Sequence, residues 1–360
     1  METLFDSLDI DTYYYQAIDL LKQLIQIPSY SRQENNATDL FEQCIRQHQL
    51  NYFRKENNLI IQPVHSNPSL ANILLNSHID TVRPVASWSR DPHKPAIEEG
   101  RLYGLGSNDA GASLVSLLYT FIALQHIEQP YNLYFAVSAE EEVSGKNGFE
   151  SIREELPPIS FAIVGEPTGM NAAIAEKGLM VIDGVVYGKS GHAARNEGIN
   201  AIYEALPVME RIHQFEFPKV SELLGSTRVS LTQINAGTQH NVIPDRCEFV
   251  LDVRTNECYS NQEAFELLQQ QLGCELKARS FRLNSSYIEP SHPFVRRVAM
   301  LEKKLFGSPT LSDQALMPFP SVKIGPGDSA RSHTADEYIQ LDEIREAIPL
   351  YIKLLNQLHV

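Results

Sequence analysis

The sequence feature that most constrains the fold is an alternation of helical and strand patterns along the first half of the chain. Residues 12–27 and 111–124 carry apolar side chains at helical spacing. Short apolar runs typical of strands lie at 58–63, 71–77, 132–138 and 160–165. Such alternation predicts an α/β fold, in which a mostly parallel sheet is flanked by helices and ligands collect beyond the carboxyl ends of the strands.

The pattern changes between residues 179 and 287. Strand and helix patterns there follow the order strand, helix, strand, strand, helix, strand, which is that of a ferredoxin-like α+β sandwich. Their ranges are 180–189, 199–212, 228–237, 247–255, 261–272 and 275–284. After them, residues 292–306 and 341–358 again indicate helices, with a strand at 321–326 between them. We therefore expect a domain of residues 179–287 inserted into a larger domain formed by 1–178 and 288–360.

Composition excludes several classes of protein. Hydrophobic residues make up 43% and charged residues 21%, the profile of a soluble globular protein, and no apolar run is long enough to cross a bilayer. A net charge of −15 argues against nucleic acid or an anionic membrane as partner. The start, METLFDSLDIDTYYY, lacks the basic and apolar runs of a secretory signal. The four cysteines form no CxxC pair and indicate reduced thiols, so we expect a cytoplasmic protein.

Two clusters of polar side chains follow apolar strand patterns directly. In LNSHIDTV, His78 and Asp80 lie two residues apart at a strand end, where both side chains face the same side. Taken alone, this pattern also fits a capped strand end. In VSAEEEVSG, residues Glu140, Glu141 and Glu142 repel one another, so a positive charge such as a metal ion is expected nearby. The competing interpretation is a solvated acidic loop.

Three further polar residues occupy comparable positions. Asp109 lies in GLGSNDAGAS between a Gly-rich turn and a helix, and taken alone this position favours an N-cap. Glu166 follows another apolar strand in AIVGEPTGM. His333 lies in a loop of IGPGDSARSHTADEY, where a lone histidine is commonly a surface residue. Together these nitrogen and oxygen donors predict a divalent metal site that suits zinc and also accepts cobalt or manganese.

Other catalytic chemistries find less support. There is no GxSxG elbow, and Ser190 of SGHAAR lies in the inserted region, so a Ser-His-Asp hydrolase is disfavoured. No cysteine lies in a setting that would activate a thiol. The phosphate-binding pattern GxxxxGK[ST] is also missing, which argues against a nucleotide site at Asp109.

In these motifs the chain resembles the M20 metallopeptidase and deacylase family. The resemblance covers nearly the whole length, and GEPTGMNAAIAEKG, SGHAARNEGINAI and GPGDSARSHTADEY are most similar to the acetylornithine deacetylase branch. It implies a zinc-exopeptidase-like domain with an inserted lid domain that closes over the substrate about hinges near 178 and 288. Relatives often read Asp-x-Lys-Gly where this chain has Asp109-Ala110-Gly111-Ala112. The lysine, which is not a ligand in the family, is missing here.

The resemblance also implies residue roles. His78 and Glu166 resemble the ligands of one metal ion, and Glu142 and His333 those of a second. Asp109 resembles the aspartate that bridges both ions and is often followed by a cis peptide bond, here to Ala110. The remaining roles are those of the residue that orients His78 (Asp80), the general base (Glu141), the oxyanion stabiliser (His192) and two substrate contacts (Asn241 and Arg254).

The activity implied is hydrolysis of the amide bond of an N-acyl amino acid, with N2-acetylornithine or acetylcitrulline as substrate in arginine biosynthesis. Desuccinylation of N-succinyl-ornithine, -citrulline or -diaminopimelate remains open, as does dipeptidase, carboxypeptidase or aminoacylase activity. A succinyl group would require another cation, for which Arg195 and Arg331 are candidates. The alternative from another class is a non-catalytic binding protein that kept the fold. The resemblance further implies a homodimer through the inserted domain.

Overall fold

The computed structural model describes residues 8–195 and 197–360, and the chain divides into two compact units. The start of the segment analysed for a secretory signal, 1–7, and residue 196 of the SGHAARN stretch lie outside the described residues. Unit 1 comprises Met1–Ile174, Ile288–Phe306 and Ser312–Val360, and unit 2 comprises Ala175–Tyr287 and Gly307–Leu311. The insertion was expected over 179–287. Unit 2 begins earlier, at Ala175, and also includes the short segment Gly307–Leu311.

A mixed sheet forms the centre of unit 1, which confirms the α/β fold class. Its strands lie in the order β1-β2-β6-β3-β7-β19-β8-β17, where β17 is Ser286–Tyr287, and β18 (Leu305–Ser308) also pairs with β8. The four strands β6, β3, β7 and β19 are parallel, whereas β1, β2 and β8 pair antiparallel at the two sides. The bounds are Tyr52–Lys55 for β1, Asn58–Ile61 for β2, Ala71–His78 for β3, Tyr131–Ser138 for β6, Phe161–Val164 for β7, Ala172–Glu176 for β8 and Ser321–Lys323 for β19.

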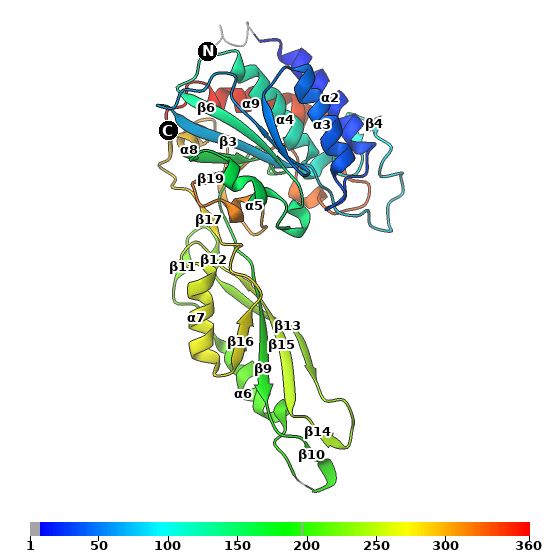
Figure 1. The fold of residues 1–360 in the computed structure, drawn as a ribbon, viewed down its shortest axis with the longest axis vertical. Helices are drawn as coiled ribbons and strands as arrows, with labels where there is room; N and C mark the ends of the chain where they lie inside the picture. The colour runs from blue at the N-terminus through cyan, green and yellow to red at the C-terminus, as the bar shows by residue number, and fades with distance from the viewer. Residues whose placement is uncertain (1–7, 196) are drawn as a thin grey trace. The chain divides into compact units, whose positions relative to one another are not determined.

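Helices α2 (Ile10–Ile25), α4 (Ala112–Gln125) and α9 (Leu341–Leu355) pack against one another beside this sheet (Figure 1). Every residue of α4 from Ala112 to Leu124 is buried, because α2 and α9 cover the faces that the sheet leaves free. A helix that is apolar all round needs such a position. The remaining helices of unit 1 are α3 (Asn35–Gln47), α5 (Phe149–Ile152) and α8 (Pro293–Met300).

Two sequence-based expectations in unit 1 need correction. The helix expected over 292–306 ends at Met300, because Glu302 adopts a positive φ of 56° and the chain continues as strand β18 (Leu305–Ser308). The strands expected at 58–63 and 321–326 end earlier, at Ile61 and Lys323. A three-stranded sheet of β4 (Ala96–Glu98), β5 (Arg101–Tyr103) and β20 (Tyr338–Gln340) has no counterpart in the sequence-based scheme.

Unit 2 contains the predicted sandwich of a four-stranded antiparallel sheet and two helices. The strands lie in the order β13-β15-β9-β16, and α6 and α7 pack on one side of them (Figure 1). The main bounds are Met180–Tyr187 for β9, Ala201–Gln214 for α6, Arg228–Ala236 for β13, Arg246–Arg254 for β15, Asn261–Leu272 for α7 and Glu275–Ala278 for β16. The short strands are Gly191–His192 (β10), Val220–Ser221 (β11), Gly225–Ser226 (β12), Val242–Ile243 (β14) and Ser286–Tyr287 (β17).

The two faces of the unit 2 sheet differ because apolar and polar residues alternate along its strands. β9 alternates between buried and half-buried positions, and its buried residues Met180, Ile182 and Val186 join Phe249 and Leu251 of β15 in one core. The other side of the sheet carries charged pairs such as Arg279 with Asp183. A two-layer sandwich therefore forms, with one solvated sheet face.

The described part of the chain contains no helix that is both long and apolar enough to span a membrane.

Candidate metal centre

The parallel strands of unit 1 deliver the candidate ligands to one edge of the sheet. His78 is the last residue of β3 and lies in register with Ser138, the last residue of β6. The acidic residues Glu140–Glu142 follow β6 directly, and Glu166 comes two residues after β7. Since the carboxyl ends of parallel strands meet at the same edge, these side chains converge although they are far apart in the sequence.

Asp109 reaches the same place from the turn that precedes α4. This turn spans Ser107–Gly111, and the peptide bond between Asp109 and Ala110 is cis, as the resemblance implied. Gly106 begins the turn with φ at 75°, and a Cβ atom there would lie 2.5 Å from Thr81, so a glycine is required. The side chain of Asp109 does not cap α4, so the N-cap interpretation is wrong.

The five expected ligands form two groups of three that share Asp109. The first group is His78, Asp109 and Glu166, and the second is Asp109, Glu142 and His333. The Nε2 atom of His78 lies 3.3 Å from Oδ1 of Asp109 and 3.6 Å from Oε1 of Glu166. In the second group, Nε2 of His333 lies 2.8 Å from Oε2 of Glu142 and 3.6 Å from Oδ2 of Asp109.

Asp109 thus presents one carboxylate oxygen to each group. A bridging carboxylate in this geometry suits a pair of divalent ions, which in dinuclear sites lie about 3.5–4 Å apart. Imidazole nitrogen and carboxylate oxygen are donors that zinc accepts readily. The residues present therefore fit two divalent ions, one bound by each group.

The carboxylates of this site are crowded and shielded from water. Burial raises the pKa of Glu166 to about 8, with a further contribution from the charge of Asp109, although His78 opposes the shift. Burial also raises the pKa of Glu142 and raises that of Glu141 well above its ordinary value. Bringing these groups together as anions requires compensating positive charge, which bound cations would supply.

The pKa values of the two histidines are also raised, but by the neighbouring carboxylates and against the effect of burial. The hydrogen bond to Glu142 raises the pKa of His333 to about 9. Burial alone would lower the pKa of His78, but its contacts with Asp109 and Asp80 outweigh burial and raise it. For Asp109, burial is likewise outweighed by the hydrogen bond from His78, so the pKa of this carboxyl is lowered. In the metal-free protein, protons bound to these side chains therefore compensate the negative charge that metal ions would otherwise neutralise.

The acidic segment after β6 is fixed by buried carboxylates and is no solvated loop. Asp80 is 1% exposed and accepts the backbone N–H groups of Glu141 and Glu142, at 3.0 and 3.1 Å. Glu34 is fully buried and accepts the backbone N–H of Glu140 at 3.2 Å. The Glu141 carboxylate itself has no hydrogen-bond partner among the described residues, which leaves it free to act on a bound molecule.

Asp80 orients His78 mainly through its main chain. The nearest acceptor to Nδ1 of His78 is the backbone carbonyl oxygen of Asp80, at 2.9 Å, whereas the Asp80 carboxylate lies 3.5 Å away. A backbone carbonyl fixes the tautomer of a histidine ligand as well as a carboxylate does. Nε2 is then left to face Asp109.

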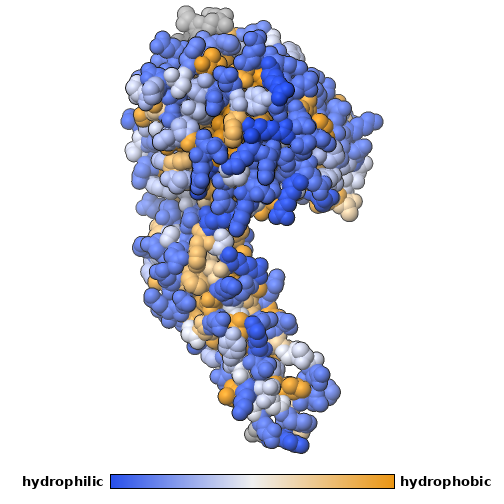
Figure 2. Space-filling view, viewed as in Figure 1, coloured by the Kyte–Doolittle hydropathy of each residue, from blue (hydrophilic) through white to orange (hydrophobic). Residues whose placement is uncertain are grey.

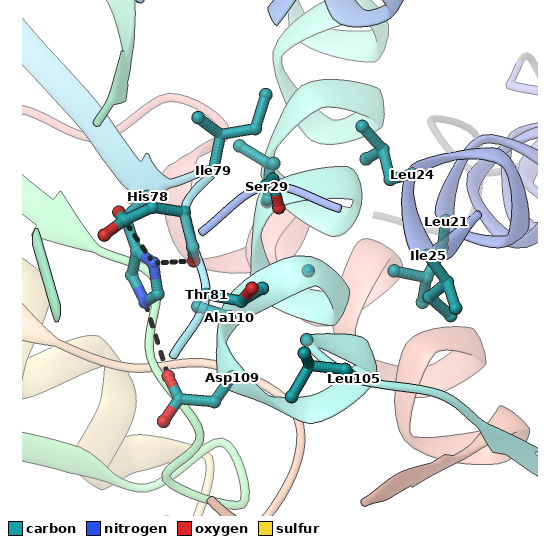
Figure 3. A pocket seen from close by; sticks show the side chains of 14 residues that line it. Leu21, Leu24, Ile25, Ser29, His78, Ile79, Thr81, Leu105, Asp109 and Ala110 are labelled. Carbon is teal, nitrogen blue, oxygen red and sulfur yellow. Dashed lines mark hydrogen bonds and ion pairs between the residues drawn. The ribbon is translucent and has the colours of Figure 1, made fainter. Parts of the chain in front are cut away.

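A small cavity of about 20 Å³ lies directly behind this pair. Figure 3 shows the His78 imidazole and the Asp109 carboxylate facing each other on one side of it, with Leu21, Leu24 and Ile25 of α2 on the other. A space of this size holds about one water molecule. The aliphatic side chains of α2 mean that this side of the site is backed by the core of unit 1.

The three expected site residues of unit 2 do not lie together. His192, on β10, is exposed and adjoins Asn241, because the backbone N–H of Ala193 donates to the carbonyl oxygen of Asn241 at 3.1 Å. Arg254 is the last residue of β15, at the end of the sheet remote from β10. Its guanidinium binds Asp252 through two hydrogen bonds, at 2.8 and 3.1 Å.

The two arginines considered for an additional carboxylate differ in availability. Arg331 is engaged by Glu343 through two hydrogen bonds, at 2.6 and 3.1 Å, and its guanidinium stacks on Tyr338. Arg195 is exposed in a short turn of unit 2. The Arg331 guanidinium is therefore already paired with a carboxylate, as that of Arg254 is.

Several residues of the site escaped the sequence-based scheme. Glu34 and Glu337 hold ligand-bearing segments through backbone N–H groups. Asp313 is a buried carboxyl whose Oδ2 accepts a hydrogen bond from Ser138 at 2.5 Å, and burial raises its pKa to about 6. Only Glu337 lay in a quoted motif, and no local pattern distinguishes an acidic residue that binds backbone from one on the surface.

The fold and the paired donor groups define a metal-dependent hydrolase. The model of peptidase family M20/M25/M40 matches residues 74–357, and the chain belongs to this family. It is a metal-dependent amidohydrolase of the M20 type. Among similar characterised proteins, a succinyl-diaminopimelate desuccinylase from Corynebacterium glutamicum is 27% identical, over 94% of this chain and 96% of the relative. An acetylornithine deacetylase from Buchnera aphidicola is 26% identical, over 94% and 97%.

Solved structures share the fold over nearly the whole chain. A dinuclear metal binding peptidase of the M20 family from Bacillus subtilis superposes with a TM-score of 0.75, at 18% identity, and covers 96% of this chain and 98% of its own. The aminopeptidase PepT from Bacillus cereus gives a TM-score of 0.75 at 17% identity, covering 95% and 98%. At such identities the likeness establishes the fold alone.

Proposed function

We propose that this protein uses two divalent metal ions to hydrolyse the amide bond of an N-acyl amino acid. The ligands are His78 and Glu166 for one ion, Glu142 and His333 for the other, and Asp109 for both. The observation that carries this proposal is the placement of Asp109, whose two oxygens face the two separate histidines.

Metal ions bound there would polarise the amide carbonyl and lower the pKa of a bound water. Glu141 takes a proton from the attacking water and delivers it to the departing amine. Two features support this role: its carboxylate has no partner among the described residues, and its backbone is fixed by Asp80. The non-catalytic alternative is disfavoured because the base position and every ligand position are occupied.

Unit 2 supplies groups for the substrate in this proposal. His192 donates to the oxygen that becomes negatively charged, a type of contact worth about 3–4 kcal/mol in the transition state. Asn241 adjoins it through the Ala193 backbone and contacts the same substrate. Arg254 binds the substrate carboxylate, because its planar fork matches both oxygens.

The separation of His192 and Arg254 supports a homodimer. His192 lies on β10, near the end where β15 begins, and Arg254 is the last residue of β15, a nine-residue strand that at the usual rise per residue spans roughly 25–30 Å. One copy of unit 2 therefore cannot bring both groups to one substrate molecule. We propose that His192 acts on the substrate bound by the partner copy.

The surface of unit 2 carries features that suit this association. On α6, Tyr203 is 68% and Leu206 is 59% exposed, and on the edge strand β13 Ile234 is 58% exposed. Figure 2 shows such hydrophobic residues among the hydrophilic surface of this unit. An uncovered edge strand beside apolar helix residues is a typical place for a second copy to pair.

For the substrate we propose N2-acetylornithine or acetylcitrulline, and zinc for the metal, in a cytoplasmic enzyme of arginine biosynthesis. The motifs GEPTGMNAAIAEKG and GPGDSARSHTADEY support this choice, as does the 26% identity to an acetylornithine deacetylase. The donor set of nitrogen and oxygen supports zinc, with cobalt or manganese as alternatives.

A desuccinylase is the second candidate, and one observation favours it. Arg228 lies directly opposite Arg254 in the antiparallel register, and Nζ of the buried Lys177 donates to the Ser226 carbonyl oxygen nearby, at 2.9 Å. Like charges in register are destabilising unless anions compensate them, and Asp252, which binds Arg254, supplies one such charge. A succinyl group carries the additional carboxylate that such a cluster would hold.

Hydrolysis of a substrate panel tests both candidates. The purified protein, loaded with zinc or cobalt, is assayed on acetyl and succinyl derivatives of ornithine, citrulline and diaminopimelate. We expect the acetyl compounds of ornithine or citrulline to give the highest kcat/KM. A preference for succinyl compounds would select the second candidate. Failure to cleave any amide while two ions per chain are bound would contradict the amidohydrolase proposal.

A further inference from the structure

Glu337 lies outside both ligand groups, yet its side chain is almost completely buried beside them. It is 2% exposed and directly precedes β20. Its carboxylate accepts three backbone N–H groups from the turn that carries Asp109: that of Gly106 at 3.0 Å, that of Asn108 at 2.8 Å and that of Asp109 itself at 3.0 Å. Both oxygens take part, so this carboxylate is not available as a further metal ligand.

A buried carboxylate is an unusual choice for satisfying backbone N–H groups in a turn. Water or a neutral side chain would serve at lower cost, because burying an ionised carboxyl is unfavourable unless strong hydrogen bonds compensate. Charge-assisted bonds are shorter and more directional than neutral ones. Three such bonds within the four residues Gly106–Asp109 fix the orientation of the backbone from which the Asp109 side chain projects.

The segment that carries Glu337 also carries the proposed ligand His333, and it forms further hydrogen bonds to the turn of Asp109. His333 lies four residues before it. Nδ2 of Asn108 donates to the Asp328 carbonyl oxygen at 3.1 Å, and the backbone N–H of Asp328 donates to Oδ1 of Asn108 at 3.0 Å. The backbone N–H of Gly104 donates to the Glu337 carbonyl oxygen at 3.0 Å. The Asp109 turn and the His333 loop are therefore held as one piece.

We propose that Glu337 is a positioning residue of the metal centre, which sets the direction of the shared ligand Asp109 and couples it to His333. The proposal rests on the assignment of Asp109 as the shared ligand. Replacing Glu337 by glutamine keeps the shape but turns one acceptor oxygen into a donor that faces a backbone N–H group. Loss of outer-shell partners typically lowers metal affinity about 10–100-fold.

The neighbouring residue offers a matched control. Asp336 also accepts backbone N–H groups, from Ser89 at 3.0 Å and from Arg90 at 3.2 Å, and the Ser89 hydroxyl at 2.6 Å. It thus has the same chemistry in the same segment, but the loop that it holds carries none of the ligands. Asp336 is partly exposed whereas Glu337 is buried, so a purely structural role predicts a loss of stability, larger at Glu337, without a selective loss of metal affinity.

The experiment compares Glu337→Gln, Asp336→Asn and the wild-type chain by titrating each metal-free protein with Zn²⁺ or Co²⁺ alone. We expect Glu337→Gln to weaken metal affinity about 10–100-fold and to change the visible spectrum of the Co²⁺ form. Asp336→Asn should leave both within about twofold of wild type. Wild-type affinity and spectrum in Glu337→Gln, or equal losses in the two variants, would overturn the proposal.

If Glu337→Gln does not fold, Glu337→Asp takes its place, because it keeps the charge and shortens the reach. Weakened Co²⁺ affinity, together with the circular dichroism and melting temperature of the metal-free wild type, would support the proposal, and wild-type affinity would overturn it. No substrate enters these measurements. A wrong substrate class would therefore appear in the amide panel, while a wrong role for Glu337 would appear in metal binding.

Discussion

The carboxylate of Asp80 accepts a hydrogen bond from the backbone N–H of Glu141, with 3.0 Å between Oδ1 and N. Its other oxygen accepts the N–H of Glu142 at 3.1 Å and the hydroxyl of Ser31 at 2.7 Å. One buried carboxylate therefore holds the main chain of both the proposed base and a proposed ligand. The same residue holds the His78 ring through its carbonyl oxygen.

Asp80→Asn should lower kcat or metal affinity by about 10–100-fold. The variant places an NH₂ group opposite one of the two backbone N–H groups that the carboxylate accepts, and two donors cannot bond to each other. Ser31→Ala removes one donor and leaves both backbone contacts intact, so its effect should be smaller. Steady-state kinetics and metal titration on the two variants check this order. A larger loss in Ser31→Ala than in Asp80→Asn would contradict the assigned contacts.

Glu141→Gln should reduce kcat by about 10²–10⁴-fold while two metal ions stay bound, because the variant keeps the shape but cannot take a proton. Glu140→Gln is the matched control. The Glu140 carboxylate accepts a hydrogen bond from Asn147 at 3.1 Å, which a glutamine oxygen also accepts. Turnover and metal content are measured on the same samples. Equal activity of the two variants would remove Glu141 from its role.

His78→Ala and His333→Ala should each remove one metal ion, with different consequences for stability. His78 is 2% exposed, so its removal should also cost about 0.5–3 kcal/mol of unfolding free energy in the metal-free protein. The His333 side chain is 55% exposed, so its loss should cost the metal-free protein less unfolding free energy than the loss of His78. Elemental analysis after dialysis and chemical denaturation report the two effects. Retention of both ions in either variant would refute the ligand assignment.

Metal binding should release protons, and metal affinity should increase with pH. In the metal-free protein the pKa of Glu166 is raised to about 8 by burial, and that of His333 to about 9 by its bond to Glu142. Both groups carry protons at pH 7 and must lose them to bind a cation. Calorimetric titration in buffers of different ionisation enthalpy measures the release. An affinity independent of pH between 6 and 9 would speak against these ligands.

The same shifts predict that the metal-free protein becomes less stable as pH rises. Both groups have folded pKa values above their ordinary values of 4.5 and 6.5, so the folded state binds their protons more tightly. This stabilisation is complete below the ordinary pKa values. It is lost as pH rises through about 8 for Glu166 and about 9 for His333. Thermal unfolding with a chelator, from pH 5 to 9, should show the decline, and excess zinc should reverse its direction.

Mixing two inactive variants tests whether His192 serves the partner copy. A Glu141→Gln chain paired with a His192→Ala chain contains one active site with both lesions and one with neither. After subunit exchange the mixture should regain about one quarter of wild-type activity. The unmixed variants are the controls, and light scattering gives the oligomeric state. A mixture that stays inactive, or a monomeric wild type, would contradict the proposed arrangement.

The periodic parts of the fold were predictable from the sequence, and the connecting parts were not. β3, β6, α4 and α7 lie within two residues of their expected ranges, because long apolar periodicity survives in any context. Helix α3 was not expected, since its polar residues obscure the few apolar positions that face the core. The end of α8 depends on the backbone of Glu302, which no local pattern indicates.

Positions directly after strands indicated His78, Glu142 and Glu166 as candidate ligands. Asp109, in a turn, and His333, in a loop, became candidates only through the combined pattern and the family resemblance.

The residues that support the candidate ligands could not be predicted from the sequence. Glu34, Asp313 and Glu337 contact the site through backbone groups or a single hydroxyl, and such contacts carry no sequence pattern. The engagement of Arg331 by Glu343 was equally invisible, because it depends on a loop returning to α9.

The place of β19 in the sheet has a consequence for how the protein is made. This strand lies between β7 and β8 but comes after the inserted unit in the chain, as do His333 and Glu337. A nascent chain halted before residue 321 would lack β19 in its sheet and His333 in the second ligand group. Under the proposed ligand assignment, both ligand groups would be complete only in a molecule whose synthesis has passed residue 333.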